Sequence, residues 1–242
     1  MRGGPGVNEL RIIPLPSVAM VKDGDDLVAM FLEALGTSAT TLEHRDLIIV
    51  TSKVVSKAEG QVVDFDGTEE HKVALIEGES VRILRRRGPL RITETHHGFI
   101  NANAGIDLSN TDDGTAVLLP KDPDRSAWRF RAEIQRRCGV EVAVIITDTF
   151  GRVWRVGVTD VAIGSAGVKP VLDLRGTTDA TGRVLEVTEV AIADEIAGAA
   201  NLVLGKAEAT PFAIVRGLDA AYFGEGSIKE SALRRSNEDL FR

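Results

Sequence analysis

The sequence is poor in the residues that several protein classes require. It holds one cysteine, Cys138, among 242 residues, which excludes an intramolecular disulfide and a cysteine-based zinc site. The first residues, MRGGPGVNEL, lack the apolar core of a signal peptide, and nowhere do about 18 apolar residues run together. These absences predict a soluble cytoplasmic protein with no membrane partner.

The chain also has fewer positively than negatively charged residues. The chain has 29 basic against 36 acidic residues, a formal net charge of −7, which argues against a surface that binds nucleic acid. Of the 29 basic residues 21 are arginine, whose planar fork suits phosphate and carboxylate groups. A local basic pocket for a small anionic ligand therefore remains open.

Common nucleotide-binding and hydrolase motifs are missing as well. Gly205-Lys206 lacks both the upstream glycine spacing and the following Ser or Thr of a P-loop. The sequence contains neither a GxGxxG fingerprint nor a GxSxG elbow. If the protein binds a nucleotide, it does so without these devices.

What is present predicts a mixed α/β (α+β) fold with at least two sheets, in one domain over 1–242 that has room for two subdomains. Continuous β-branched runs at 47–51 and 142–147 predict buried strands. Further strands are expected at 8–15, 116–119 and 212–216, and one or two strands at 81–92, whereas 158–166 and 170–175 alternate small and apolar residues among glycines. Helices are expected at 25–35, ended by Gly36, at 123–138 with Trp128 inward, at 189–204, and as a partly exposed helix in the tail 224–242.

Both buried strands lead into polar residues, and the carboxyl ends of strands are where sheet proteins usually bind ligands. Ser52, Lys53, Ser56 and Lys57 follow the first strand, where lysines beside hydroxyls could hold phosphate oxygens or could be solvated in a loop. The cluster Arg85 to Arg87 is expected in an exposed turn.

Acidic residues suggest a second kind of site. Asp148, followed by Thr149, comes after an apolar run, so it either caps the next element or coordinates a hard cation. Asp107 and Asn110 share a loop in which Gly105 permits a tight turn, and they fit either a magnesium or manganese site or an Asx-turn. Arg152 and Arg155 flank Trp154, either as anion contacts beside an aromatic face or as a solvated face over a core tryptophan.

Three long segments make the sequence similar to a known family. They are TSKVVSKAEG at 51–60, HHGFINANAGIDLSN at 96–110 and ITDTFGRVWRVGVTDVAIGSAGVKPVLDLRG at 146–176. These segments and the order in which they occur resemble those of the coenzyme F420-0:L-glutamate ligases (F420 gamma-glutamyl ligases), including the N-terminal domain of the two-domain actinobacterial enzymes. The resemblance extends from IIPLP at 12–16 to AIVRG at 213–217. The flavin-binding, nitroreductase-like domain of the two-domain enzymes is not expected in this chain.

The resemblance implies an enzyme that uses GTP and Mn²⁺ or Mg²⁺, with K⁺ as a further candidate ion, to add L-glutamate to coenzyme F420-0 and to build a gamma-linked oligoglutamate tail. It also implies an intertwined homodimer of an unusual mixed α/β fold without a P-loop. The metal ligands carried over by position are Asp107, Asp148, Thr149 and Glu208. The nucleotide-binding residues are Ile13, Pro14, Leu15, Pro16, Ser52, Lys53, Lys57, Asn110, Gly205, Lys206, Ala207 and Glu208.

The mechanism expected from this resemblance passes through an acyl phosphate. Lys57, Asp107 and Asp148 are the expected catalytic residues, and Arg152 and Arg155 are expected to hold carboxylates of the substrates. The alternatives are a metal-dependent nucleotide hydrolase and a regulatory module that binds GTP without turnover. Against both, Arg152, Trp154 and Arg155 offer anion and aromatic contacts beyond those a nucleotide needs.

Overall fold

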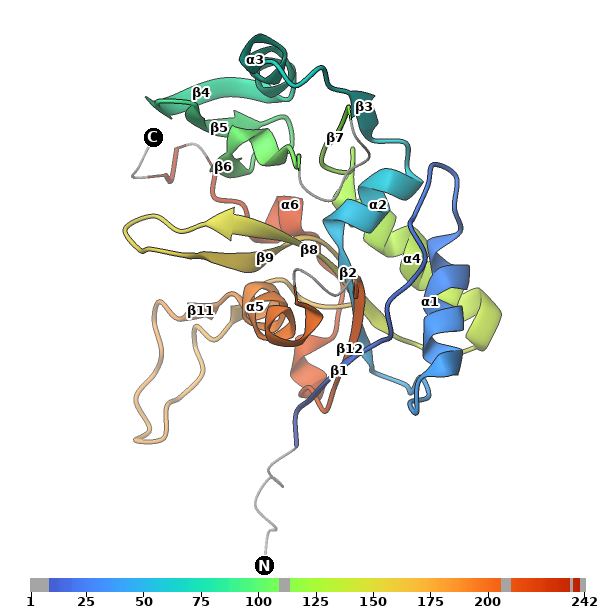
Figure 1. The fold of residues 1–242 in the computed structure, drawn as a ribbon. Coiled ribbons are helices and arrows are strands. Elements are labelled where there is room, and N and C mark those ends of the chain that lie inside the picture. Colours follow the sequence, from blue (N-terminus) through green and yellow to red (C-terminus); the bar gives the residue numbers. More distant parts are fainter. Residues whose placement is uncertain (1–8, 109–113, 206–209, 236, 240–242) are drawn as a thin grey trace, which may run out of the picture.

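A mixed five-stranded sheet forms the centre of the computed structural model, which describes residues 9–108, 114–205, 210–235 and 237–239 (Figure 1). Its strand order is β1 (Arg11–Pro14), β12 (Phe212–Arg216), β2 (Leu47–Thr51), β8 (Ala143–Gly151) and β9 (Val158–Ala166). The pairing of β2 with β8 is parallel, and the other pairings in this sheet are antiparallel. The expectation of a mixed α/β fold is confirmed.

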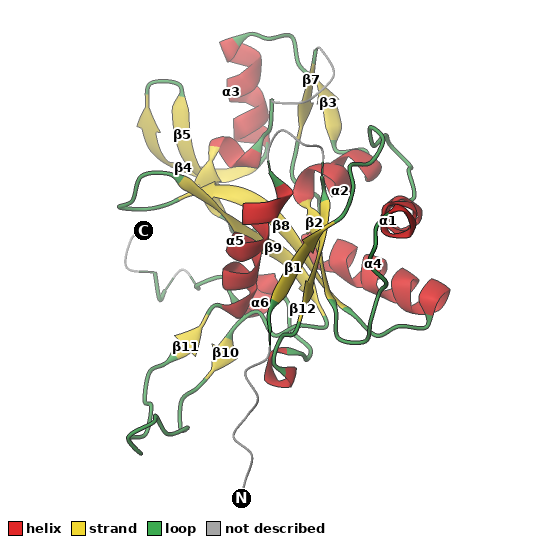
Figure 2. Cartoon of the chain, turned by 60° about the horizontal axis from the view of Figure 1, so that its bottom comes forward, coloured by secondary structure: helices red, strands yellow, loops and turns green. Residues whose placement is uncertain are grey.

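Helices cover both faces of this sheet. Helices α1 (Leu27–Thr37) and α4 (Pro123–Cys138) lie on one face, and α5 (Ile192–Leu204) lies on the other (Figures 1 and 2). Phe31 of α1 meets Phe130 of α4 and Phe212 of β12 edge to face, with ring centroids 5.7 and 5.6 Å away. These aromatic contacts join the helical layer to the sheet and close the core between them.

A second group of elements lies at the top of Figure 1, above the carboxyl end of β2. Strands β3 (Val62–Asp64) and β7 (Thr115–Val117) pair with each other, and β4 (Ser80–Arg87), β5 (Leu90–Thr95) and β6 (Ile100–Ala102) form an antiparallel sheet beside α3 (Glu69–Gly78). The short turn η1 (Asn103–Gly105) follows β6. This group brings the loop that carries Asp107 to the main sheet.

The remaining elements are short. Strands β10 (Leu172–Asp173) and β11 (Glu189–Val190) begin an arm that projects from the body (Figure 2), and η2 (Ala220–Tyr222) and α6 (Ile228–Ser231) follow β12. None of the helices in the described part of the chain is long and apolar enough to cross a membrane.

Several sequence-based expectations need correction. Trp128 was expected inward but is 58% exposed, because the buried stripe of α4 runs through Ala127, Phe130 and Ile134 and Trp128 lies beside it. Helix α1 continues past Gly36 to Thr37 and is capped by the side chain of Asp26. The residues 52–58 form the helix α2 (Ser52–Ala58) rather than a loop, Arg85 to Arg87 lie within strand β4, and the tail 224–242 holds only the short α6 among its described residues.

The packing of α4 on β9 yields a first prediction. A methyl group on Gly164 of β9 would lie 2.3 Å from the backbone carbonyl of Pro123, where α4 begins. Because neither backbone can yield easily, we expect Gly164→Ala to lower the free energy of unfolding by about 3 kcal/mol and the melting temperature by roughly 6–12 °C. Thermal unfolding followed by circular dichroism measures this.

Gly36 provides the matched control. It lies inside α1, and a Cβ there would meet nothing within 4 Å. Gly36→Ala should therefore raise stability slightly, by at most about 1 kcal/mol, since alanine favours the helix. Equal melting temperatures for Gly164→Ala and the wild type would contradict the close approach of α4 to β9.

Candidate functional site

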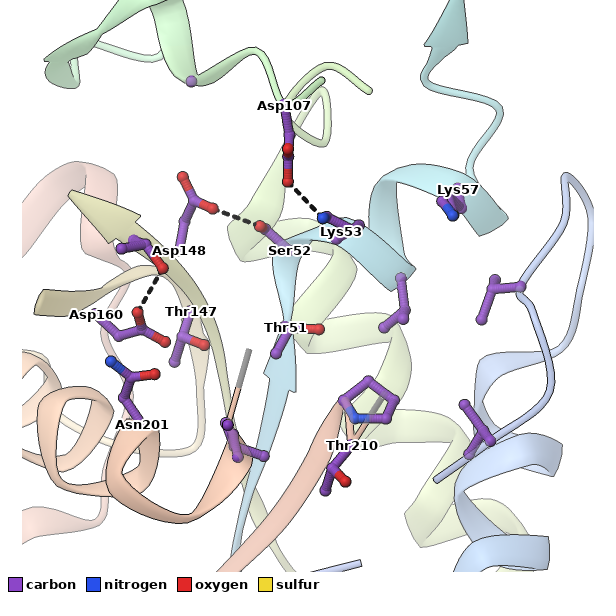
Figure 3. Close-up of a pocket in the computed structure, with 18 of the residues that line it drawn as sticks. Thr51, Ser52, Lys53, Lys57, Asp107, Thr147, Asp148, Asp160, Asn201 and Thr210 are labelled. Atoms are coloured by element: carbon purple, nitrogen blue, oxygen red, sulfur yellow. Dashed lines mark hydrogen bonds and ion pairs between the residues drawn. The ribbon is translucent and has the colours of Figure 1, made fainter. Parts of the chain in front are cut away.

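A cavity of about 750 Å³ opens at the carboxyl ends of β2 and β8, within the size range of typical ligand sites. Figure 3 shows its polar side chains, which come from β2, α2, β8, β9, α5, the loop after η1 and the residues before β12. The lining comprises Val18, Ala19, Met20, Val21, Thr51, Ser52, Lys53, Val54, Lys57, Ala102, Gly105, Ile106, Asp107, Thr147, Asp148, Thr149, Val158, Asp160, Asn201, Leu204, Gly205, Thr210 and Pro211.

The parallel register of β2 and β8 creates this site. Thr51, the last residue of β2, lies opposite Thr147 within β8, so Ser52 and Asp148, which come next along the chain, are neighbours although 96 positions separate them. The chain turns directly from β2 into α2, and the Ser52 hydroxyl donates a hydrogen bond of 2.8 Å to Asp148 Oδ1. Asp148 lies within β8 rather than at a helix start, so it does not cap a helix as one alternative proposed.

The surroundings of Asp148 disfavour its charged form. Burial, together with repulsion from the negative charges of Asp160 and Asp107, raises the pKa of the Asp148 carboxyl to about 7. Hydrogen bonds from the Ser52 hydroxyl and the Thr149 backbone amide act in the opposite direction and do not compensate. A positive ion in the cavity would relieve this repulsion.

Asp160 is a site residue that the sequence analysis missed. It lies on β9 opposite Thr149, it is only 5% exposed, and the Thr149 hydroxyl donates a hydrogen bond of 2.7 Å to its Oδ1. A signal existed, because Asp160 is the one charged residue of the segment VTDVAIGSA at 158–166. Asn201 of α5 reaches the same region from the other face of the sheet (Figure 3).

Helix α2 directs two lysines to the cavity. Lys53 and Lys57 are four residues apart and therefore share one side of the helix. Lys53 Nζ lies 2.6 Å from Asp107 Oδ2, and Lys57 Nζ lies 3.2 Å from the sulfur of Met20. Because Lys57 is only 8% exposed, the alternative of a freely solvated loop lysine is wrong for this residue.

An unusual turn positions Asp107. The residues Asn103, Ala104 and Gly105 have positive φ angles of 51, 56 and 70°. A Cβ on Gly105 would approach the Asn101 amide and Leu119 to 2.9 Å, so glycine is required there, as the sequence had suggested. The backbone of Asp107 then pairs with Val117, which leaves its carboxylate facing Lys53.

Of the other predicted nucleotide-binding residues, some line the cavity and some do not. Ile13 and Pro14 belong to β1, and Leu15 and Pro16 follow it, whereas the described residues that line the cavity begin at Val18. Gly205 lines the cavity, and Asn110, Lys206, Ala207 and Glu208 lie outside the described residues.

Arg152 and Arg155 lie at the tip of the β8–β9 hairpin, and neither is among the described residues that line the cavity. Trp154 between them is 86% exposed with a φ of 63°, so the alternative of a core tryptophan is wrong. The role of the two arginines stays a prediction.

The donor set fits a hard divalent cation. Among the described residues no three His, Cys, Asp or Glu side chains are close enough to form a ready metal cluster. Four oxygen donors nevertheless line the cavity together with Asp148, namely the carboxylates of Asp107 and Asp160 and the hydroxyls of Ser52 and Thr149. Mg²⁺ and Mn²⁺ prefer oxygen ligands, and their positive charge would offset the repulsion between the carboxylates.

Comparisons with known proteins point to one family. A family model described as F420-0:Gamma-glutamyl ligase matches residues 17–217. Three curated proteins named Coenzyme F420:L-glutamate ligase are similar over nearly their whole length. The protein of Methanothermobacter thermautotrophicus is 40% identical over 96% of this chain and 99% of its own. That of Methanopyrus kandleri is 41% identical over 98% and 99%, and that of Archaeoglobus fulgidus is 38% identical over 96% of each.

The raised pKa of Asp148 predicts a pH-dependent stability of the metal-free protein. A carboxyl with a pKa of about 7 in the fold and 3.8 otherwise destabilises the fold progressively as the pH rises from about 4 to about 7. Asp148→Asn removes this penalty, so we expect the variant to be more stable at pH 8 by roughly 2–4 kcal/mol and to gain little at pH 4.5. Thermal unfolding in EDTA at both pH values tests this.

Asp173 supplies a control, because the fold shifts its pKa in the opposite direction. Arg175 lowers the pKa of the exposed Asp173 carboxyl to about 2, so Asp173→Asn should bring no gain at pH 8. If Asp148→Asn were no more stable than the wild type at pH 8, the penalty assigned to this carboxylate would be absent.

Proposed function

The chain belongs to the F420-0:gamma-glutamyl ligase family and is thus a ligase, and we propose that it joins L-glutamate to the terminal carboxylate of coenzyme F420-0 at the expense of GTP. The observation that carries the proposal is a single cavity lined by the carboxylates of Asp107, Asp148 and Asp160 and by the two lysines of α2, of which Lys53 pairs with Asp107 (Figure 3). It offers binding groups both for a divalent cation and for phosphate.

The reaction needs an activated carboxylate, because a free carboxylate is a poor acyl donor. We propose that a carboxylate oxygen of F420-0 attacks the γ-phosphorus of GTP, which breaks the bond to GDP and forms an acyl phosphate. The amine of L-glutamate then attacks the acyl carbon, inorganic phosphate leaves with the bonding electrons, and the amine loses a proton. Repetition on the γ-carboxylate of the added glutamate would lengthen the tail.

The residues of the cavity suit the first of these steps. Phosphoryl transfer depends mainly on positioning and on compensation of negative charge. Lys53 and Lys57, on one side of α2, are proposed to contact the phosphate oxygens as point charges. Lys57 is already desolvated, so its attraction to an incoming phosphate is screened little by water.

Divalent cations complete the proposed site. Asp107, Asp148 and Thr149 would hold Mg²⁺ or Mn²⁺, and Glu208, which lies outside the described residues, is proposed as a further ligand. When bound, such ions neutralise the charge that develops on the phosphate oxygens. Since Lys53 pairs with Asp107 in the present structure, we propose that this pair separates, with the lysine moving to phosphate and the aspartate to the cation.

The direct test is mass spectrometry of F420-0 incubated with the protein, GTP, MnCl₂ and L-glutamate. We expect the mass of one or more glutamyl units to be added, with GDP and phosphate formed in equal amount to the new amide bonds. Omitting GTP, manganese or glutamate should each prevent the increment. GTP hydrolysis without any glutamyl product would contradict the proposal and favour a nucleotide hydrolase.

A pair of variants makes the test specific to the cavity. Asp148→Asn should lower the rate of ligation by at least about 100-fold, because a proposed metal ligand and its charge are lost. Asp66→Asn, which changes an exposed aspartate outside the cavity lining, should leave the rate unchanged. Near-normal turnover of Asp148→Asn would show that the assignment is wrong.

We further propose that the protein is a homodimer. The tip of the β8–β9 hairpin exposes Val153, Trp154 and Val156 by 68, 86 and 100%, and the arm between β10 and β11 exposes Val187 by 85%. Both segments project from the body on the left of Figure 1. Apolar side chains on projecting hairpins are costly in water and are typical of surfaces that a second copy covers.

Sedimentation velocity tests the dimer. The wild type should sediment as a species of twice the chain mass of 26.0 kDa, and the double variant Trp154→Ser with Val156→Ser should shift towards the monomer. Leu202 is equally exposed at 86% but lies on α5, so Leu202→Ser should remain dimeric. A monomeric wild type at micromolar concentration would refute the proposal.

A further inference from the structure

Asp160 is a buried carboxylate whose role the proposed reaction has not yet used. It belongs to β9, whereas the proposed metal ligands Asp148 and Thr149 belong to β8. The antiparallel register places Asp160 directly opposite Thr149, and a hydrogen bond of 2.7 Å from the Thr149 hydroxyl to Asp160 Oδ1 joins the two side chains. Both side chains line the cavity.

The direction of this hydrogen bond decides whether the Thr149 hydroxyl can bind a cation or an anion. A hydroxyl has one proton to donate and two lone pairs to accept with, and an ionised carboxylate can only accept. The proton of Thr149 must therefore point at Asp160. Its lone pairs are left for a group in the cavity, so the hydroxyl can bind a cation but cannot donate to an anion while the bond lasts.

The carboxylate also strengthens the oxygen as a ligand. A charge-assisted hydrogen bond shifts electron density towards the donor oxygen and holds its rotamer, as partners behind metal ligands commonly do. In addition, the side chains of Asp107, Asp148 and Asp160 all line the cavity into which the Thr149 hydroxyl opens. A cation at Thr149 would be attracted by all three carboxylates.

We propose that Asp160 is a positioning residue that orients the Thr149 hydroxyl, so that the hydroxyl serves as a ligand for the divalent cation. The inference rests on the proposed function, because it presupposes that the cavity binds Mn²⁺ or Mg²⁺. It differs from a purely structural role, in which the bond between Thr149 and Asp160 would only join β8 to β9. It also differs from direct ligation by Asp160.

The three roles predict different effects on Mn²⁺ affinity, which electron paramagnetic resonance measures as the loss of the free-ion signal when protein is titrated in the presence of GDP. Asparagine at position 160 can still accept the hydroxyl proton but carries no charge, whereas alanine can do neither. For a positioning residue we expect Asp160→Ala to weaken Mn²⁺ binding by about 10–100-fold and Asp160→Asn by less.

A double-mutant cycle separates positioning from direct ligation. If Asp160 acts through the hydroxyl, its replacement by alanine should have little effect in the Thr149→Val background, where no hydroxyl remains to be oriented. The conservative Thr149→Ser should restore the full effect of Asp160→Ala. If Asp160→Ala weakens Mn²⁺ binding as much in the Thr149→Val background as in the wild type, the positioning role is overturned and Asp160 is a direct ligand.

Asp194 provides the matched control. It is also a partly buried carboxylate next to β9, but it accepts a hydrogen bond of 3.0 Å from the backbone amide of Ala162 and is not among the described residues that line the cavity. Asp194→Asn should leave Mn²⁺ affinity unchanged. Melting temperatures in EDTA verify that each variant is folded before titration.

The outcomes distinguish this inference from the proposed function. Unchanged Mn²⁺ affinity in both Asp160 variants, with tight binding by the wild type, would overturn the positioning role and leave the ligase proposal standing. A wild type that binds no Mn²⁺ even with GDP would overturn both, because no cation would then need the hydroxyl. A loss of Mn²⁺ affinity on Asp160→Ala that occurs with threonine or serine at position 149, but not with valine, supports the inference.

Discussion

The parallel pairing of β2 with β8 is the constraint on which the candidate site depends. It sets Thr51 beside Thr147, so that α2 begins next to the point at which β8 continues with Asp148. The hydrogen bond between Ser52 and Asp148 is the direct result of this register. A register shift by one residue would turn the Asp148 side chain to the opposite face of the sheet and separate it from Ser52.

The extension of β8 beyond this point provides the second half of the site. Because β8 continues as far as Gly151 and pairs with β9, the carboxylate of Asp160 comes to lie next to Thr149. The loop after η1 adds Asp107 from the smaller sheet, and α2 adds two lysines. Negative and positive side chains from four parts of the chain thus line one cavity, and burial together with the charges of Asp107 and Asp160 raises the pKa of Asp148 there.

Much of the fold could be predicted from local sequence. The β-branched run at 47–51 and the strand at 212–216 have the predicted bounds, and helix α4 has the predicted bounds because Asp122 and Pro123 begin it and Gly139 ends it. The predictions failed where local pattern was ambiguous. Polar residues at 52–58 suggested a loop, but packing of Val54 and Val55 on the core forms a helix there. Trp128 was assigned to the core by residue type, although its position on α4 is beside the buried stripe.

The sequence by itself indicated the family and the main elements, since long motifs and hydrophobic runs are local properties of the chain, and it singled out several of the polar residues that line the cavity, among them Lys53, Asp107 and Asp148. Only the tertiary structure decided the burial of Lys57, the raised pKa of Asp148 and the contact between Thr149 and Asp160. The reason is physical. Burial and electrostatic repulsion depend on distances between side chains from different strands, and those distances follow from strand register, which no single segment specifies.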